Sequence, residues 1–291
     1  MRLLIAADAV TPTNAGLVRA IRARGFDSQV VPASALAARA GPPDTVLGRV
    51  DVLPTLDGAS SCLWILRQIE ERGVHVLNSA AALLTAHDKL LTAVRLSRSG
   101  VPHPATAHVD ERAPVPGLRF PVVVKPRFGS WGKDVFLCRT RRDLRCLLPA
   151  LRDRGWFRRQ GAVVQELVPP CGYDLRLVVA GGEVIGGIER VAAPGEWRTN
   201  VSLGGRRRRL EHVPPEAAAL AIGAAGALAT DLAGVDLLPT EEGGWTVLEV
   251  NGAVDFTEDY ALGGEDVFDE VAVRVLADAC RASAAPVLVA L

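Results

Sequence analysis

Two carboxylates and one amide lie close together near residue 250, in a pattern that suits a hard cation. Asp236 precedes Glu249 by thirteen residues, and Asn251 follows Glu249 by two. Residues 235–238 and 246–250 are short apolar runs, and the Gly- and Pro-containing stretch between them predicts the turn of a hairpin. Because side chains alternate along a strand, Glu249 and Asn251 share one face. Oxygen ligands without His or Cys favour Mg²⁺, although an acidic hairpin without a metal fits the same residues equally well.

A glycine-containing loop between two predicted strands could contact phosphate. The β-branched run 120–124 ends in Lys125, and residues 135–137 resume the extended pattern. The loop between them contains three small residues, Gly129, Ser130 and Gly132. Glycines let the backbone approach phosphate oxygens and donate N–H groups to them. The segment lacks the GK[ST] ending and the following helix of a Walker-type loop, and an ordinary hairpin turn is the alternative interpretation.

The segment 162–168 predicts a further strand, which carries Glu166 just before two prolines. An edge of this kind could bind adenine, since backbone groups and the carboxylate can exchange hydrogen bonds with the exocyclic amine and a ring nitrogen. A buried strand that ends in a surface glutamate is the alternative interpretation.

The order and spacing of these segments resemble the ATP-grasp superfamily, and in particular its glutamate-ligase branch. That branch includes the ribosomal-protein glutamate ligase and the lysine-biosynthesis aminoadipate ligase. The likeness extends from about Asp51 to Phe256 and includes Ala86–Lys89. The G-S-W-G sequence of the loop at 129–132 and the Asp-Phe pair that follows E-V-N resemble the aminoadipate ligases within this branch.

The resemblance implies an α/β fold with α+β lobes, in which an N-terminal open α/β domain precedes the ATP-grasp lobes. We expect the N-terminal domain at 1–85, a central lid lobe at 86–160 and a C-terminal catalytic lobe at 161–291. A strand at 3–7, a helix at 14–24 and a strand at 26–31 predict a βαβ start. This start has no G-x-G-x-x-G motif, so it does not indicate a dinucleotide-binding domain.

The resemblance also implies a role for each matching residue. The positions that match nucleotide contacts are Lys89, Lys125, Gly129, Ser130, Gly132, Gln165, Glu166, Leu167 and Asp174, with Glu166 and Leu167 at the adenine hinge and Asp174 near the ribose. Those that match residues around the transferred phosphoryl group are Arg190, Arg198 and Asn200. The positions that match ligands of two Mg²⁺ ions, with Mn²⁺ as a substitute, are Asp236, Glu249 and Asn251.

The implied reaction is ATP-dependent amide formation through an acyl phosphate, in which glutamate or another amino acid is joined to an amino-acid, peptide or carrier-protein substrate. A carboxylate and ATP repel each other, so Lys125, Arg190 and Arg198 would supply positive charge with the metal. The loop with Trp131 at its tip is the expected lid against water. A phosphotransferase on the same fold and a catalytically silent ATP-binding regulator are the alternative functions.

Four consecutive arginines, Arg206–Arg209, form the one segment of low complexity. They could recruit a multiply anionic substrate or an acidic protein tail, and a solvated surface is the alternative interpretation. The resemblance adds the expectation of a homo-oligomer.

Composition excludes several other classes of protein. The chain has 291 residues, of which 49% are hydrophobic. Its 33 basic and 33 acidic residues give zero formal net charge, so the composition shows no excess of positive charge of the kind that binds nucleic acid. Its five cysteines contain no C-x-x-C pair, which favours reduced thiols, and no histidine has metal-ligand spacing. The alanine-rich run 217–229 is too short to span a bilayer and predicts a helix packed on the sheet. We expect a cytoplasmic enzyme that binds neither nucleic acid nor membrane.

Overall fold

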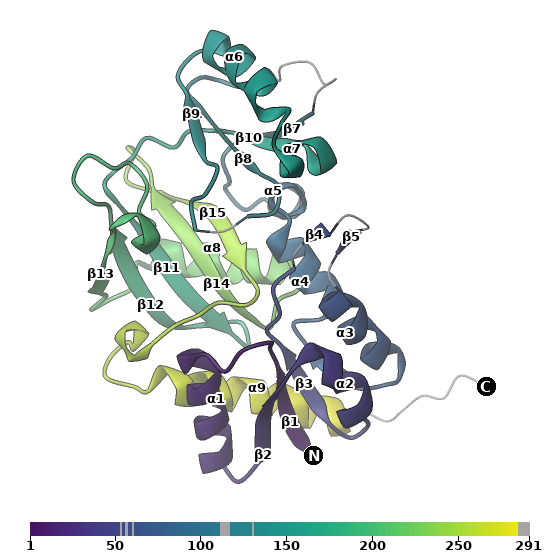
Figure 1. Ribbon diagram of the computed structural model, residues 1–291. Helices are drawn as coiled ribbons and strands as arrows, with labels where there is room; N and C mark the ends of the chain where they lie inside the picture. The colour runs from purple at the N-terminus through teal and green to yellow at the C-terminus, as the bar shows by residue number, and fades with distance from the viewer. Residues whose placement is uncertain (53, 56–57, 60, 111–116, 130, 285–291) are drawn as a thin grey trace.

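The computed structural model describes residues 1–52, 54–55, 58–59, 61–110, 117–129 and 131–284. Within these residues three larger sheets form three lobes (Figure 1), an N-terminal lobe, a lid lobe at the top of the view and a C-terminal lobe below it.

The N-terminal lobe is a parallel sheet in the order β2-β1-β3-β6. Its strands are β1 (Arg2–Ala6), β2 (Asp27–Val31), β3 (Thr45–Gly48) and β6 (His75–Leu77), and its helices are α1 (Pro12–Ala23), α2 (Ala33–Arg39), α3 (Ser61–Glu71) and α4 (Ala80–His87). Parallel neighbours need crossover connections, and α1 supplies the first of them. The Thr11 hydroxyl accepts a hydrogen bond from the Asn14 N–H at the start of α1, and Gly25 follows its end at a φ of +84°. The predicted βαβ start is confirmed.

The lid lobe is an antiparallel sheet in the order β7-β10-β8-β9. Its strands are β7 (Thr106–Val109), β8 (Val122–Pro126), β9 (Phe136–Cys138) and β10 (Ala162–Glu166), and α6 (Arg141–Leu151) and α7 (Gly155–Gln160) cover it. α5 (Lys89–Arg98) leads into this lobe from α4. Strands β8 and β9 flank the glycine-containing loop, which confirms the predicted strand–loop–strand arrangement. Because β10 belongs to this sheet, we propose that the lid lobe extends beyond residue 160, to Glu166.

The C-terminal lobe is an antiparallel sheet in the order β13-β12-β11-β14-β15, whose strands are β11 (Tyr173–Ala180), β12 (Glu183–Val191), β13 (Arg206–Arg209), β14 (Leu232–Pro239) and β15 (Trp245–Asn251). The predicted hairpin is β14–β15, with Asp236 opposite Glu249. Helix α8 (Pro215–Ala227) packs on one face through Ala217, Ala221 and Ala224. Its glycines were expected to share this contact, but Gly223 and Gly226 face solvent, because the alanines occupy the buried stripe.

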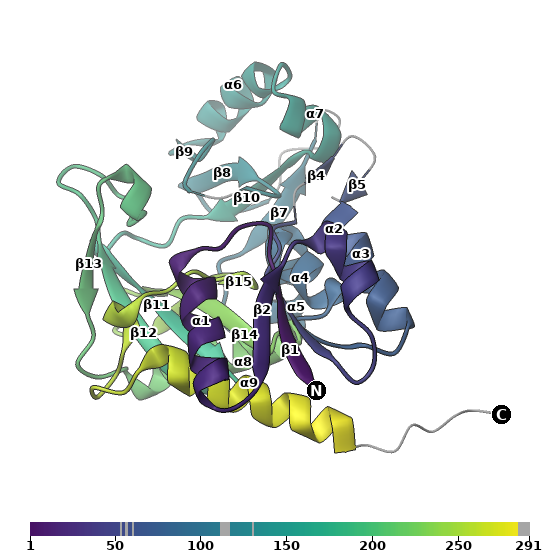
Figure 2. The ribbon, with the colours of Figure 1, turned by 60° about the horizontal axis from the view of Figure 1, so that its bottom comes forward.

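Helix α9 (Val267–Ala284), near the C-terminus, lies beside α1 of the N-terminal lobe (Figure 2). One core contains Leu3 and Ile5 of β1, Val178 of β11, and Val271 and Val275 of α9. The C-terminal helix therefore fastens the N-terminal lobe to the C-terminal lobe, whereas the lid lobe has a separate core.

Candidate active site

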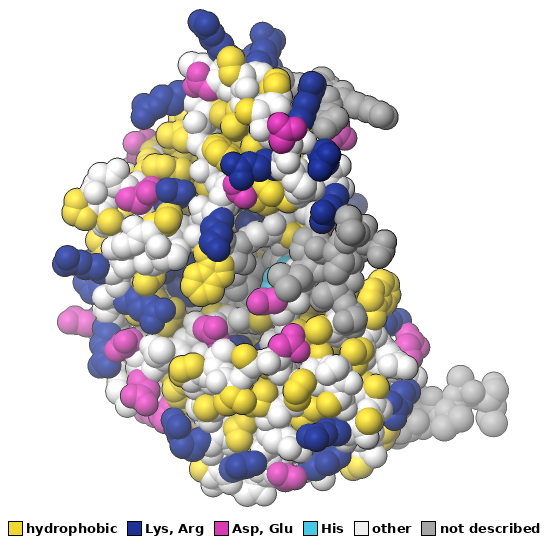
Figure 3. Space-filling model, in the orientation of Figure 1, with side chains coloured by type: hydrophobic (Ala, Val, Ile, Leu, Met, Phe, Trp, Pro, Cys, Tyr) yellow, Lys and Arg dark blue, Asp and Glu magenta, His cyan; other side chains and the backbone are white. Residues whose placement is uncertain are grey.

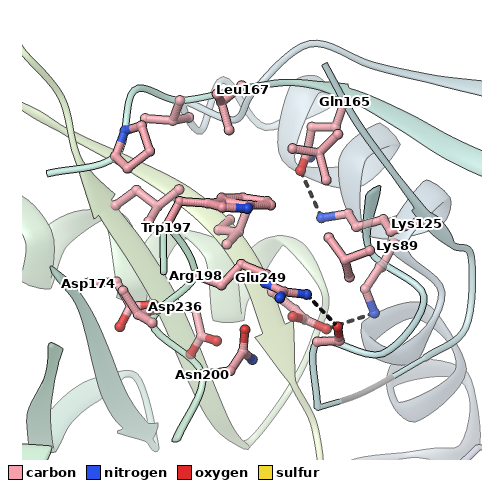
Figure 4. A pocket seen from close by; sticks show the side chains of 18 of the residues that line it. Lys89, Lys125, Gln165, Leu167, Asp174, Trp197, Arg198, Asn200, Asp236 and Glu249 are labelled. Atoms are coloured by element: carbon pink, nitrogen blue, oxygen red, sulfur yellow. Dashed lines mark hydrogen bonds and ion pairs between the residues drawn. The ribbon is translucent and has the colours of Figure 1, made fainter. Parts of the chain in front are cut away.

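A cleft between the lid lobe and the C-terminal sheet holds almost all the residues singled out from the sequence. A cavity of about 150 Å³ in this cleft is lined by every predicted site residue except Ser130 and Asn251. Ser130 lies outside the described residues, and Asn251 lines the cavity next to it. Figure 4 shows lysines, arginines and carboxylates converging on this space from both lobes, and Figure 3 shows a hollow between the upper lobe and the body of the molecule.

A second cavity of about 440 Å³ continues from the first toward the N-terminal lobe. Five residues line both spaces, namely Trp131, Arg190, Asn200, Asp236 and Glu249. Residues that line only the second cavity include Asp8, Arg49, Arg207, Asn251, Asp255 and Tyr260. The shared residues mark the junction at which a group bound in one cavity can meet a group bound in the other.

Lys125 is oriented by a chain of hydrogen bonds that reaches the next lobe. Its Nζ donates to Gln165 Oε1 at 2.8 Å, as Figure 4 shows. The Gln165 amide then donates to Thr106 Oγ1 at 2.9 Å and lies 3.1 Å from His103 Nε2, while His103 Nδ1 lies 2.8 Å from the Val247 carbonyl oxygen. Burial lowers the pKa of His103 to about 4, so the ring is neutral, donates from Nδ1 and accepts at Nε2. His103 therefore acts as a buried, neutral link in this chain of hydrogen bonds.

The same burial makes Lys125 sensitive to pH. Desolvation and the nearby positive charge of Lys89 lower the pKa of Lys125 to about 8. The negative charge of Glu249 acts in the opposite direction but does not cancel them. A bound phosphate would restore the charged form, so nucleotide binding above that pH takes up a proton. We expect the affinity for Mg·ADP to fall by up to about tenfold per pH unit between pH 8 and 9.5.

Calorimetry across this range checks the effect, with two variants for comparison. Lys125→Arg should flatten the profile because arginine stays charged. Lys133→Arg, on the rim of the same cavity, should leave the profile unchanged. An unchanged affinity of the native protein from pH 7 to 9.5 would contradict the role of Lys125.

Lys89 is positioned by the start of α5. The Asp88 carboxylate accepts from the N–H groups of Leu90 and Leu91 and forms a bidentate pair with Arg127, while the Lys89 N–H donates to the Arg127 carbonyl at 3.1 Å. The Lys89 Nζ then reaches the Gly129 carbonyl at 2.6 Å and Glu249 at 2.9 Å. Asp88 lies inside a motif noted in the sequence, and its cap of α5 is local, whereas its ion pair with Arg127 joins residues 39 apart.

At the predicted adenine hinge, backbone groups rather than the Glu166 carboxylate are available to bind a base in the cavity. Arg119 donates to both oxygens of Glu166, from its backbone and from its guanidinium. The N–H groups of Glu166 and Leu167 donate to the carbonyls of Ala105 and Pro121. Val168 lines the cavity, and its N–H has no hydrogen bond within the described part of the chain. We propose this N–H as the donor to the base, which the sequence analysis did not identify.

A buried network of two arginines and two aspartates forms the floor of the site. Arg190 makes a bidentate pair with Asp174 and lies 2.9 Å from Asp236, which also accepts two bonds of 2.7 Å from Arg176. Although burial alone would raise the pKa of Asp236, Arg176 and Arg190 lower it to about 2. Thr199 donates a further hydrogen bond of 2.6 Å to the Asp174 carboxylate. We propose that Asp174 orients Arg190 rather than contacting a ribose.

The glycine-containing loop is tied to the C-terminal lobe. Arg198 Nη1 donates to the Gly132 carbonyl at 3.1 Å, and the Ser202 hydroxyl donates to the Trp131 carbonyl at 3.0 Å. Trp131 is 70% exposed, and both Trp131 and Gly132 have a φ of +67°. A Cβ on Gly132 would lie 3.0 Å from Asn200 Oδ1, so this position favours glycine for space as well as for backbone conformation. Trp131 lines both cavities, and the role of this loop as a lid against water stays a prediction.

The three proposed metal ligands lie on one hairpin. Asp236 is directly opposite Glu249, and Asn251 is opposite Gly234, to whose carbonyl its amide nitrogen donates at 3.4 Å. This bond turns the Asn251 carbonyl oxygen away from Gly234, and that oxygen accepts no hydrogen bond within the described residues. The described residues contain no cluster of three His, Cys, Asp or Glu side chains suited to a metal. Two carboxylates and one amide oxygen are nevertheless a donor set of the type that Mg²⁺ takes when phosphate completes its shell.

Solved structures with similar folds are ATP-grasp enzymes. An ATP-grasp RimK domain protein from Sphaerobacter thermophilus matches with a TM-score of 0.69 and 23% identity, covering 95% of this chain and all of that chain. The D-alanine–D-alanine ligase of Bacillus anthracis complexed with ATP matches with a TM-score of 0.67 and 15% identity. The match covers 97% of this chain and 98% of that chain. The three lobes and the cleft between them therefore define the ATP-grasp fold.

Comparison with sequence families narrows this class. The model of the RimK-like ATP-grasp domain matches residues 83–271. A probable alpha-L-glutamate ligase of Aeromonas salmonicida is 32% identical over 234 residues, which are 78% of this chain and 75% of that protein. A probable alpha-L-glutamate ligase of Pseudomonas paraeruginosa is 33% identical over 230 residues, which are 77% of this chain and 73% of that protein. The chain belongs to the RimK-like ATP-grasp family, and it is an ATP-dependent carboxylate–amine ligase that uses ATP with Mg²⁺. In the described residues no helix is long and apolar enough to cross a membrane.

Proposed function

We propose that this ligase joins an amino acid, with glutamate as the first candidate, to a carboxylate held in the second cavity. The junction between the cavities supports this proposal most directly. Arg190, Asn200 and the Asp236–Glu249 pair line both the cleft between the lid and C-terminal lobes and the second, separate cavity. Curated relatives are named as probable alpha-L-glutamate ligases, which favours glutamate as one substrate.

The residues of the junction suit transfer of a phosphoryl group to a carboxylate. One oxygen of the substrate carboxylate attacks the γ-phosphorus of ATP, the bond to the β–γ bridging oxygen breaks, and ADP leaves. Both reactants are anionic, so Lys125, Arg190 and Arg198 lower the barrier by placing positive charge along the path. Arg190 serves this purpose best, because Asp174 and Asp236 fix its orientation before any ligand arrives. The amine then attacks the acyl carbon, and phosphate leaves as the amide forms.

Asp236, Glu249 and Asn251 would hold Mg²⁺, which would partly neutralise the charge of the phosphate groups. In the structure Lys89 and Arg176 pair with the two carboxylates. These contacts keep the acids ionised, since the pKa of Glu249 is lowered by Lys89 and Lys125 against the effect of burial.

The acyl phosphate must be protected from water, and the loop that carries Trp131 is our candidate for the lid. Its bonds to Arg198 and Ser202 hold it over the junction in the described state. The free thiols of Cys138, Cys146, Cys171 and Cys280 and the dependence on ATP favour a cytoplasmic location, and a homo-oligomer stays a prediction.

Hydroxylamine trapping tests the proposal. Purified protein with Mg·ATP is offered amino acids, dipeptides and acidic peptides, and ADP release is measured with and without hydroxylamine. We expect one acid to stimulate ADP release and to yield a hydroxamate, the product of an activated acyl group, which together with ADP release indicates an acyl phosphate. ADP release with a stable phosphorylated product and no hydroxamate would instead identify a phosphotransferase. ATP binding without ADP release from any mixture would favour the silent regulator.

A further inference from the structure

The four-arginine segment has two different faces, because it forms the edge strand β13. Arg208 and Arg209 are paired, with Glu189 and Asp259 respectively. Arg207 instead lines the second cavity and has no hydrogen bond or carboxylate partner within the described residues. The strand register places Arg207 directly opposite Arg190 on β12. Two like charges opposite each other in a sheet are unfavourable, and Arg190 already has two carboxylates while Arg207 has none.

A second unsatisfied polar group lies beside Arg207. Tyr260 lines the same cavity and is only 2% exposed, yet its hydroxyl has no hydrogen bond within the described part of the chain. Buried tyrosine hydroxyls normally find a partner. Burial raises the pKa of Tyr260, while the positive charges of Arg176, Arg207 and Arg190 act in the opposite direction.

The fold holds Tyr260 in this position. Arg209, two residues beyond Arg207 on the same face of β13, donates to Asp259 at 3.0 and 3.2 Å and so fastens the turn Glu258–Tyr260 to the strand. On the inner side Tyr260 packs edge to face on Phe256. A Cβ on Gly186 would lie 3.0 Å from the Tyr260 carbonyl, so a glycine on β12 allows this close approach.

We propose that Arg207 and the Tyr260 hydroxyl form an anion subsite in the second cavity, which binds a side-chain carboxylate of a dicarboxylic amino-acid substrate. The inference rests on the proposed ligase function and specifies its substrate class. Arg207 and Tyr260 line the second cavity but not the nucleotide cleft, so the bound carboxylate is distinct from ATP. Asp8 and Asp255 also line this cavity, with Asp255 paired to Arg49 at 3.0 Å, and carboxylates suit the ammonium of an amino acid better than a bare dicarboxylate.

Equilibrium binding tests the subsite without requiring turnover. Protein with Mg²⁺ and a non-hydrolysable ATP analogue is titrated calorimetrically with L-glutamate and L-aspartate, and with their neutral isosteres L-glutamine and L-asparagine. We expect at least one acid to bind at least about tenfold more tightly than its amide. Arg207→Gln should abolish that difference, and Tyr260→Phe, which removes only the hydroxyl, should reduce it severalfold.

Arg206→Gln is the matched control, because Arg206 is adjacent on the same strand, lies on the opposite face and does not line the cavity. It should retain the preference for the acid. The subsite is wrong if Arg207→Gln keeps the preference, or if the native protein prefers neither acid over its amide. ADP release is measured separately on the same proteins. A ligase that turns over only neutral substrates would overturn the subsite alone, whereas Arg207-dependent glutamate binding without ADP release would overturn the ligase function alone.

Discussion

Asp236→Asn should cost about 3 to 5 kcal/mol of the free energy of unfolding, which is the range for breaking a buried ion pair by removing one partner. The Asp236 side chain is 5% exposed and accepts from Arg176 and Arg190 at once. An asparagine there removes the negative charge and turns an NH₂ group toward two guanidinium groups that can only donate. Urea denaturation at neutral pH measures the change from the midpoint and slope.

An exposed pair of the same geometry provides the control for Asp236→Asn. Arg24 donates to both oxygens of Asp269 at 3.0 and 2.6 Å, but the two side chains are 37% and 44% exposed. Asp269→Asn should therefore cost less than about 1 kcal/mol. Equal losses for the two variants would mean that Asp236 and its arginines are solvated, and would contradict a preorganised Arg190.

The sequence predicts the parts of this site that lie on a single element. The alternation of β15 places Glu249 and Asn251 on one face, and the run that ends in Lys125 predicts a strand next to a glycine-containing loop. These predictions depend on local backbone periodicity, which a few consecutive residues determine. The resemblance then brings Lys89, Arg198 and Asn200 into the same cleft, where the structure also places them.

The sequence does not predict partners that depend on which strands are neighbours. Arg190 meets Asp174 because β12 pairs with β11, and it reaches Asp236 because β14 lies on the other side of β11. His103 lies between two prolines, and nothing local indicates that its ring meets Gln165 from a strand 62 residues away. The arginine segment had two interpretations for the same reason, since only its pairing with β12 shows which arginine faces the cavity.

Glu249→Gln should lower the rate of amide formation by at least about a hundredfold, the lower limit for removing one preorganised charge from a reacting centre. Glutamine keeps the volume of the side chain, and its carbonyl oxygen can still accept from Lys89 Nζ, which lies 2.9 Å from Glu249 Oε1. Glu249 is 27% exposed, so the fold should tolerate the change. ADP release and amide product at saturating Mg·ATP measure the loss. Glu242→Gln, in the exposed turn of the same hairpin, should leave the rate unchanged.

Nucleotide binding with and without Mg²⁺ separates a metal-binding role of Glu249 from a purely structural one. Without the metal, the carboxylate repels the phosphates of ADP, so Glu249→Gln should bind ADP as well as the native protein or more tightly. With Mg²⁺ the native protein should gain affinity, and the variant should lose most of that gain because one anionic ligand is missing. A structural defect would weaken ADP binding under both conditions by the same factor. The opposite signs expected with and without Mg²⁺ arise from the single negative charge of Glu249, which repels the phosphates and attracts the cation.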